Sequence, residues 1–322
     1  MSRWLVTGGA GYIGAHVARR LLESGRDVVV LDDLSTGVRA FVPEAACFVE
    51  GSIGDPAAVG DALAGCDGVV HLAALKYAGE SVKEPLRFYA NNVTGMRVLL
   101  EGVVAAGIEQ VVYSSSCSVY GTPTAVPVVE STPWAPESPY GETKLIGEWL
   151  VRDVAAAAPL AHTSLRYFNV VGSGYDDIYD VSPYNLFPLV FRAVDAGTSP
   201  KVFGDDYPTP DGTCIRDYIH VGDLADAHVA AAARLEEGVE LAPAYNIGTG
   251  TGASVQEMLD TVERVLGVDL RREVVARRPG DPARIVGDTT LAARDLGWTA
   301  AHGLDDMVAS AWAAWQSSGG AN

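Results

Sequence analysis

The hydrophobic positions in the first half of the chain alternate between two patterns. Short runs rich in β-branched residues predict strands, and longer segments with apolar residues at helical spacing predict amphipathic helices between them. The predicted strands cover residues 4–7, 27–31, 47–50, 68–71, 110–115 and 163–168, and the predicted helices cover residues 12–24, 56–64, 85–106 and 139–158. Regular alternation of strand and helix predicts an α/β fold with a doubly wound parallel sheet.

The pattern changes after about residue 170. Residues 172–183 are rich in Gly, Asp and Tyr, and residues 201–213 are rich in Gly, Asp and Pro, so both are predicted to be loops. Helices are predicted again at residues 223–235 and 254–266, and the second begins with a capping box formed by Ser254 and Glu257. Because no low-complexity linker separates the halves, we expect a second, smaller α/β lobe packed directly against the first.

Composition excludes several classes of partner. The 322 residues include 41 acidic and 23 basic side chains, a formal net charge of −18, so nucleic-acid phosphates and anionic membranes would repel the protein. The four cysteines show no paired spacing, and the chain shows no signal peptide or apolar run long enough to span a membrane. We therefore expect reduced thiols and a cytoplasmic protein. The histidines lack metal-ligand spacing, so we expect no metal site.

A glycine-rich turn predicts a dinucleotide site. The segment GGAGYIG follows the first predicted strand, and its Gly8, Gly11 and Gly14 would let the backbone approach a pyrophosphate at the start of a helix. Asp32 ends the next strand, 18 residues after Gly14, where a carboxylate can bind the adenosine ribose hydroxyls and repel a 2′-phosphate. This favours NAD over NADP. The alternative is a tight turn that binds no ligand, and Asp33 is interpreted as a solvated neighbour.

Tyr140 and Lys144 lie four residues apart, on one face of a predicted helix. A phenol with a pKa near 10 becomes a base at neutral pH only if the phenolate gains about 4 kcal/mol of stabilisation, which a nearby ammonium group can supply in part. Ser114, Ser115 and Ser116 end the fifth predicted strand, at the sheet edge where ligands bind in such folds. A serine hydroxyl there can hydrogen-bond a substrate oxygen.

Several ordered motifs together resemble the nucleotide-sugar 4-epimerases of the extended short-chain dehydrogenase/reductase family. They are TGGAGYIG, HLAALKYAGES, YSSSCSVYG and SPYGETK in the first half, and LRYFNVVG, NLFP, FGDDYPTPDGTCIRDYIHVGDLADAH and RRPGD in the second. The resemblance covers nearly the whole chain. It implies a Rossmann NAD-binding domain over residues 1–170, a mainly nucleotide-sugar-binding lobe over residues 171–322, and a homodimer. The implied activity is NAD-dependent interconversion of UDP-galactose and UDP-glucose through a 4-keto intermediate.

The resemblance also implies roles for matching positions. Tyr140 would be the general base, Lys144 would lower its pKa and hold the nicotinamide ribose, and Ser116 would hydrogen-bond the substrate. The implied cofactor-binding residues are Gly8, Gly11, Tyr12, Ile13, Gly14, Asp32, Ser52, Ile53, Lys76, Asn91, Ser114, Tyr140, Lys144 and Phe168. The implied substrate-binding residues are Ser116, Tyr140, Asn169, Asn185, Leu186, Phe203, Arg216, Arg278 and Ile285.

Two positions depart from the family's pattern or leave it undecided. Ser52 stands where the family often has an acidic residue facing the adenine, so that contact would be lost or replaced by a hydroxyl. Ile285 matches the family's gate for N-acetylated sugars, and its medium-sized side chain leaves their acceptance open. The apolar face of residues 92–104 would line a dimer interface or, equally, face the chain's own core.

Other activities stay open to different degrees. A 4-epimerase acting on UDP-N-acetylhexosamine, a UDP-pentose or a UDP-hexuronate differs only in the sugar pocket. A 4,6-dehydratase would need an Asp-Glu pair where this chain has Ser116 and Cys117. A GDP-sugar reductive epimerase would use NADPH, which Asp32 disfavours. A non-catalytic NAD-binding relative is disfavoured because Tyr140 and Lys144 are intact.

Overall fold

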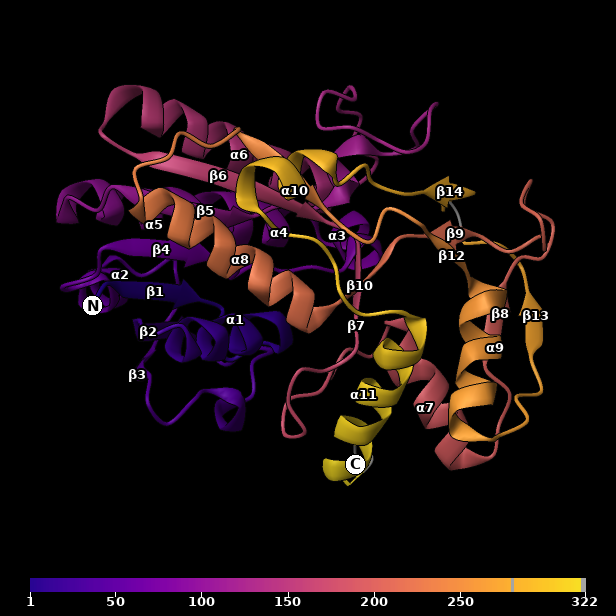
Figure 1. The fold of residues 1–322 in the computed structure, drawn as a ribbon. Coiled ribbons are helices and arrows are strands. Elements are labelled where there is room, and N and C mark those ends of the chain that lie inside the picture. The colour runs from indigo at the N-terminus through magenta and orange to yellow at the C-terminus, as the bar shows by residue number, and fades with distance from the viewer. Residues whose placement is uncertain (279–280, 320–322) are drawn as a thin grey trace.

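A seven-stranded parallel sheet forms the centre of the molecule, in a computed structural model that describes residues 1–278 and 281–319. In spatial order its strands are β11 (Ala244–Ile247), β6 (Ala161–Tyr167), β5 (Gln110–Ser114), β4 (Gly68–His71), β1 (Arg3–Thr7), β2 (Asp27–Asp32) and β3 (Cys47–Glu50) (Figure 1). Every neighbouring pair is parallel. The predicted doubly wound parallel sheet is therefore confirmed.

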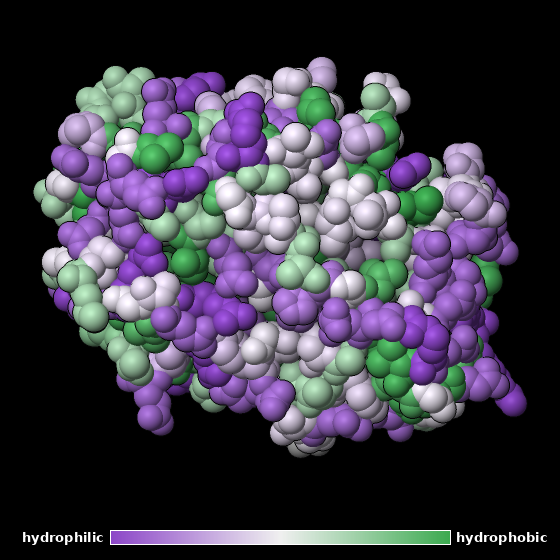
Figure 2. Space-filling view, in the orientation of Figure 1, coloured by the Kyte–Doolittle hydropathy of each residue, from purple (hydrophilic) through white to green (hydrophobic). Residues whose placement is uncertain are grey.

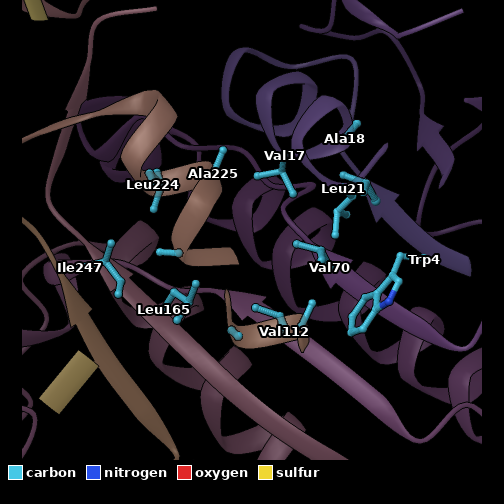
Figure 3. Close-up of a cluster of buried hydrophobic side chains, with 14 of the residues drawn as sticks. Trp4, Val17, Ala18, Leu21, Val70, Val112, Leu165, Leu224, Ala225 and Ile247 are labelled. Carbon is cyan, nitrogen blue, oxygen red and sulfur yellow. The ribbon is translucent and has the colours of Figure 1, made fainter. Parts of the chain in front are cut away.

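Helices cover both faces of this sheet. One face packs against α1 (Tyr12–Glu23), α8 (Val221–Glu236) and α10 (Thr290–Leu296), and the other against α2 (Pro56–Leu63), α5 (Gly95–Ala106) and α6 (Pro139–Ala157). Figure 3 shows side chains of α1 and α8 meeting those of the sheet, among them Leu21, Leu224 and Val70. Strand β2 is buried on both sides, because Val28 and Val30 belong to the first apolar layer and Val29 and Leu31 to the second.

The second lobe lies beside the sheet and has its own apolar core (Figure 1). Its helices are α7 (Leu186–Ala196), α9 (Val255–Leu266) and α11 (Leu304–Ser317). Its short strands pair as β7 (Asn169–Val171) with β10 (Tyr218–His220), β8 (Lys201–Phe203) with β13 (Glu273–Val275), and β9 (Ile215–Arg216) with both β12 (Ala253–Ser254) and β14 (Arg284–Ile285). The chain after residue 170 is not confined to this lobe, since α8 and β11 return to the central sheet.

Several predicted elements differ from the observed ones at particular places. Residues 201–213 are not entirely loop, because residues 201–203 form β8, whose partner strand comes about 70 residues later and leaves no local signal. The helix predicted over residues 85–106 is divided into α4 (Pro85–Tyr89), a π-helical turn at Ala90–Thr94 and α5, after a short α3 (Ala78–Lys83). Short 3₁₀ helices occur at Arg39–Phe41 and Cys117–Tyr120.

Two other expectations about helices are settled by the packing. The capping box of α9 is confirmed, since Ser254 Oγ accepts from the Glu257 N–H at 3.0 Å and the Glu257 carboxylate accepts from the Ser254 N–H at 2.7 Å. The apolar face of residues 92–104 packs on the chain's own sheet, where Met96, Leu99 and Val103 join the second apolar layer. These three side chains therefore belong to the core.

The outer surface shown in Figure 2 is largely hydrophilic, with hydrophobic residues in small groups between polar ones. No helix within the described ranges is long and apolar enough to cross a membrane. Among the same residues, no group of three His, Cys, Asp or Glu side chains is arranged to hold a metal ion. All four cysteines are free thiols.

Candidate active site

The turn after β1 packs so closely that side chains would not fit. Gly8 has a φ of +72°, and a Cβ there would lie 2.8 Å from the backbone nitrogen of Ala73, in the loop after β4. A Cβ on Gly14 would lie 2.1 Å from the carbonyl oxygen of Gly8. Helix α1 begins at Tyr12 without a side-chain cap, so its first N–H groups stay available to an anion. These features fit the pyrophosphate of a dinucleotide.

Asp32 is fixed at the carboxyl end of β2 beside this turn. Its Oδ2 accepts from the Ala10 N–H at 3.0 Å and its Oδ1 accepts from the Leu34 N–H at 2.9 Å. Burial raises the pKa of this carboxyl, while the two backbone hydrogen bonds oppose the rise. The carboxylate lines a cavity and has acceptor capacity left for ribose hydroxyls. The residues present therefore fit NAD.

Two cavities meet at the carboxyl edge of the sheet. The smaller, about 140 Å³, is lined by the predicted residues Gly8, Gly11, Tyr12, Ile13, Gly14, Asp32, Ile53, Lys76, Asn91, Tyr140 and Lys144. The larger, about 740 Å³, is lined by the predicted residues Tyr12, Ile13, Lys76, Ser116, Tyr140, Phe168, Asn169, Asn185, Leu186, Phe203, Arg216 and Arg278. Because Tyr140 lines both, a group held in one cavity can meet a group held in the other at its phenol.

Three predicted residues line neither cavity. The half-buried Ser52 accepts from the Gly54 N–H with its hydroxyl at 3.1 Å. Ser114 is fully buried, and its hydroxyl hydrogen-bonds His228 Nε2 at 2.7 Å. Ile285 is buried in an apolar cluster that includes Phe168. Its backbone position pairs with Arg216 of β9, a residue that lines the larger cavity. Of the RRPGD motif, Pro279 and Gly280 lie outside the described residues.

Helix α6 positions the predicted catalytic pair. It begins after Ser138, whose hydroxyl accepts from the Gly141 N–H at 3.2 Å, and Pro139 occupies its first turn. Tyr140 and Lys144 follow on successive turns of one face. The Lys144 ammonium donates to the Ser114 carbonyl at 2.7 Å and lies 6.0 Å from the centre of the Tyr140 ring. The helix thus brings both groups to the end of β5.

Desolvation dominates the electrostatics of this pair. Burial raises the pKa of Tyr140 to about 12, and a hydrogen bond with the Ser116 hydroxyl partly opposes the rise. Burial lowers the pKa of Lys144 to about 7, against the charge of Glu148. The protein without cofactor therefore does not show the predicted lowering of the Tyr140 pKa. A positive charge placed beside Tyr140 would favour the phenolate, because little water is present to screen it.

A buried polar network supports the pair from behind. Glu148 lies one turn after Lys144 on α6 and accepts from Arg166 of β6 at 2.9 and 2.6 Å. Ser115 donates to the same carboxylate at 2.5 Å. Arg166 also donates to the Tyr120 hydroxyl at 2.9 Å. The network joins the end of β5, β6 and α6, so it fixes the elements that carry Ser116, Tyr140 and Lys144.

Sequence reasoning missed several residues that line the larger cavity. Tyr167 lines both cavities and directly precedes the predicted Phe168, so its place in LRYFN was the available signal. Arg192 and Lys201 also line the larger cavity, but neither belongs to a motif. Asp281 forms an ion pair with Arg216. Its place as the last residue of the RRPGD motif was the available signal. The Arg278 guanidinium lies 4.0 Å from the centre of the Phe203 ring.

The charged residues that line the larger cavity have a net positive charge, opposite in sign to that of the whole protein. Within the described part of the chain its charged lining residues are Lys76, Arg192, Lys201, Arg216, Arg278 and Asp281. Five cations thus face one carboxylate in a protein with a net charge of −18. Such a cavity selects an anion, and arginine guanidinium groups suit a diphosphate.

The position of Asp32 predicts a change in cofactor selectivity. The variant Asp32→Asn keeps an oxygen acceptor and removes the charge, so we expect NAD to bind about tenfold more weakly and NADP to bind more tightly. Calorimetric titration of the cofactor-free protein with each dinucleotide measures both. The matched control Asp27→Asn, at an exposed carboxylate at the other end of β2 and outside both cavities, should change neither affinity more than about twofold. Equal effects in the two variants would contradict the assignment.

Comparison with known proteins agrees with this geometry. Residues 4–248 match the NAD dependent epimerase/dehydratase family. The UDP-glucose 4-epimerase of Streptomyces lividans is 43% identical, in an alignment that covers 98% of this chain and 96% of that protein.

Solved structures extend the similarity to the whole fold. The UDP-glucose 4-epimerase of Stenotrophomonas maltophila, with bound NAD and formylated UDP-arabinopyranose, superimposes with a TM-score of 0.94 at 38% identity and 99% coverage of both chains. The UDP-glucose 4-epimerase of Brucella ovis in complex with NAD gives a TM-score of 0.93 at 40% identity and 97% coverage of both chains. The protein therefore belongs to the NAD dependent epimerase/dehydratase family, and its cofactor is NAD.

Proposed function

We propose that the protein interconverts UDP-galactose and UDP-glucose by inverting the configuration at C4 of the sugar. The observation that carries the proposal is the cationic cavity, which adjoins the dinucleotide cavity at Tyr140. A diphosphate at Arg216 and Arg278 would leave the attached hexose to reach toward Tyr140. The similarity to UDP-glucose 4-epimerases over almost the entire chain supports this substrate.

The chain's own residues move and hold the proton. We assign Tyr140 as the base that removes the proton from the sugar's 4-hydroxyl, with Ser116 donating a hydrogen bond to the reacting oxygen. Lys144 holds the nicotinamide ribose and adds positive charge near the phenolate. When held in the smaller cavity, NAD would supply a hydride acceptor and donor for C4, so that the sugar would pass through a 4-keto form. Protonated Tyr140 then gives its proton back to the 4-oxygen, and no net oxidation or proton release remains.

Inversion requires the keto sugar to present its other face to the same hydride donor. The larger cavity supports this, because about 740 Å³ is shared by the nucleotide and the hexose. Four of the five cations belong to the second lobe: Arg192 on α7, Lys201 on β8, Arg216 on β9 and Arg278 after β13. The Tyr140 side of the cavity also presents Phe168 and Tyr167. In our proposal the diphosphate is held at the cationic side while the sugar turns at the aromatic side.

We further propose how the two lobes divide the work. Residues 1–170 hold NAD, and residues 171–322 mainly hold the nucleotide sugar, with α8 and β11 completing the central sheet instead. Except for Phe168, which was assigned to the cofactor but lines only the larger cavity, the predicted residues in the two linings support their assigned roles. Ser52, Ser114 and Ile285 act from outside the linings, Ser114 by accepting the hydrogen bond from the Lys144 ammonium.

A second candidate substrate class is favoured by one neighbour. The Stenotrophomonas enzyme is seen with formylated UDP-arabinopyranose, a UDP-pentose derivative. Ile285 is aliphatic and buried in the cluster that includes Phe168, so this position brings no charged group to the proposed sugar site. A 4-epimerase of another UDP-sugar uses the same chemistry, and a substrate panel separates the alternatives.

Turnover tests the proposed function directly. The purified protein should convert UDP-galactose to UDP-glucose, and Tyr140→Phe should lower kcat by about 10²–10⁴, because the general base is lost. The matched control Tyr89→Phe removes a hydroxyl that bonds Glu142 outside both cavities, and should keep activity. If the protein converts only an N-acetylated, pentose or uronate UDP-sugar, that sugar replaces UDP-galactose as the proposed substrate. Equal activity of the two variants would refute Tyr140 as the base.

The hydrogen bond from Ser116 predicts a pH effect. It favours the phenolate, so Ser116→Ala should raise the pKa of Tyr140 further. Activity requires the ionised phenol, and the acid limb of the kcat/KM profile, which reports the substrate-free enzyme, should therefore move to higher pH, by about one to two units. Steady-state assays across the pH range measure the shift. A uniform loss of kcat/KM at every pH would show that Ser116 acts otherwise.

We also propose a homodimer, supported by exposed apolar side chains on neighbouring helices. Val82 on α3 is 64% exposed, Leu86 on α4 is 81% exposed and Trp149 on α6 is 38% exposed, and α3 and α4 both pack against α6. Sedimentation velocity should give the mass of two chains, and Leu86→Glu should shift the protein toward one. The control Val274→Glu, at an apolar residue 52% exposed on β13, should leave the dimer intact.

A further inference from the structure

Residues 172–185, here called the strap, join β7 to α7 and pass over the nucleotide-binding side of the molecule. The Tyr12 hydroxyl donates to the Gly172 carbonyl at 2.5 Å, and the Tyr175 hydroxyl donates to Glu23 of α1 at 2.7 Å. Further along, Val181 lines the smaller cavity. The strap therefore belongs to the second half of the chain but forms part of the wall around the NAD site.

The last turn of the strap meets the first lobe through two tyrosines. The rings of Tyr77 and Tyr184 pack edge to face, with centroids 4.8 Å apart at 81°. Tyr77 follows β4 and lines the smaller cavity, whereas Tyr184 belongs to the strap and lines the larger one. Lys76, next to Tyr77, lines both. The aromatic pair thus joins the lobes at the boundary between the two cavities.

The strap end that carries Tyr184 also carries a proposed substrate contact. Asn185 follows directly, precedes the first turn of α7 and lines the larger cavity. The buried Ser182 hydroxyl accepts from the N–H groups of both Tyr184 and Asn185 at 3.2 Å, and the Asn185 side chain donates to Asp180 at 2.7 Å. Because these bonds make one local unit, a ligand that holds Asn185 also holds Tyr184 in place.

We propose that the Tyr77–Tyr184 pair is a latch that retains NAD and couples this retention to occupancy of the nucleotide-sugar cavity. In this proposal, the smaller cavity opens when the strap moves away from the first lobe, and that movement separates the Tyr77 and Tyr184 rings. A nucleotide bound at Asn185 opposes that separation, and by linkage bound NAD favours nucleotide binding to the same degree. The two tyrosines are positioning residues. The coupling rests on the proposed function, whereas the retention of NAD rests only on the pair and the family's cofactor.

Cofactor release measures the latch without relying on turnover. The protein is loaded with fluorescent NADH and mixed with a large excess of NAD, with and without UDP, and the fluorescence decay gives the release rate. Tyr77→Ala and Tyr184→Ala should each release NADH about 2- to 10-fold faster, as expected from the strength of an aromatic pair. The double variant should be no faster than the faster single variant, because both remove one contact. The variants Tyr77→Phe and Tyr184→Phe keep both rings and remove the hydroxyls that bond Ser182 and Glu80. They should release NADH more slowly than the alanine variants, and the difference isolates the ring contact.

The effect of UDP separates this inference from the proposed function. UDP should slow NADH release from the wild type and slow it less from the alanine variants. Release at the wild-type rate from both alanine variants, or equally fast release from the phenylalanine controls, overturns the latch. If UDP affects no protein, wild type included, the coupling and the UDP-sugar assignment fail together, while rates without UDP still decide retention. Thermal unfolding of each cofactor-free variant verifies its fold, and Tyr184→Leu replaces any alanine variant that does not fold.

Discussion

The buried ion pair between Glu148 and Arg166 is the contact on which the geometry of the proposed catalytic residues depends. Their side chains are 8% and 3% exposed, so water cannot replace either partner. Removing one partner of such a pair typically costs about 3–5 kcal/mol, a large part of the roughly 5–15 kcal/mol that keeps a domain folded. The carboxylate also receives the Ser115 hydroxyl and lies one turn beyond Lys144. The same bonds therefore stabilise the fold and align the end of β5 with helix α6.

Tyr140 and Lys144, the proposed catalytic pair, are buried, and burial disfavours the charged form of each. Burial raises the pKa of Tyr140 and lowers that of Lys144, so the bare site resists forming a phenolate. The Tyr140 phenol becomes a base only when positive charge and hydrogen-bond donors are placed beside it. This ties proton removal to occupancy of the adjoining NAD cavity, because the two cavities share Tyr140. In our proposal, chemistry therefore begins only in the assembled complex.

Charge is distributed to keep that complex together. The protein as a whole is strongly acidic, yet the larger cavity presents five cations. Arg216 is held by Asp281, and Arg278 lies over the Phe203 ring, so both guanidinium groups are positioned before a ligand arrives. Preorganised cations lose little side-chain entropy on binding a diphosphate. The surrounding negative charge would repel polyanions from the rest of the surface.

The sequence by itself determined the features that depend on local pattern. Alternating strands and helices specified the parallel sheet, and motif spacing specified the glycine turn, Asp32 and the Tyr140–Lys144 pair, because these need only neighbouring residues on one turn or one helix face. Only the tertiary structure decided the rest. It buried Ile285 and Ser114 outside the cavity linings, assembled cations from separate segments, and brought Tyr77 against Tyr184 across the lobes. Such contacts join residues distant in the chain, and no local periodicity records them.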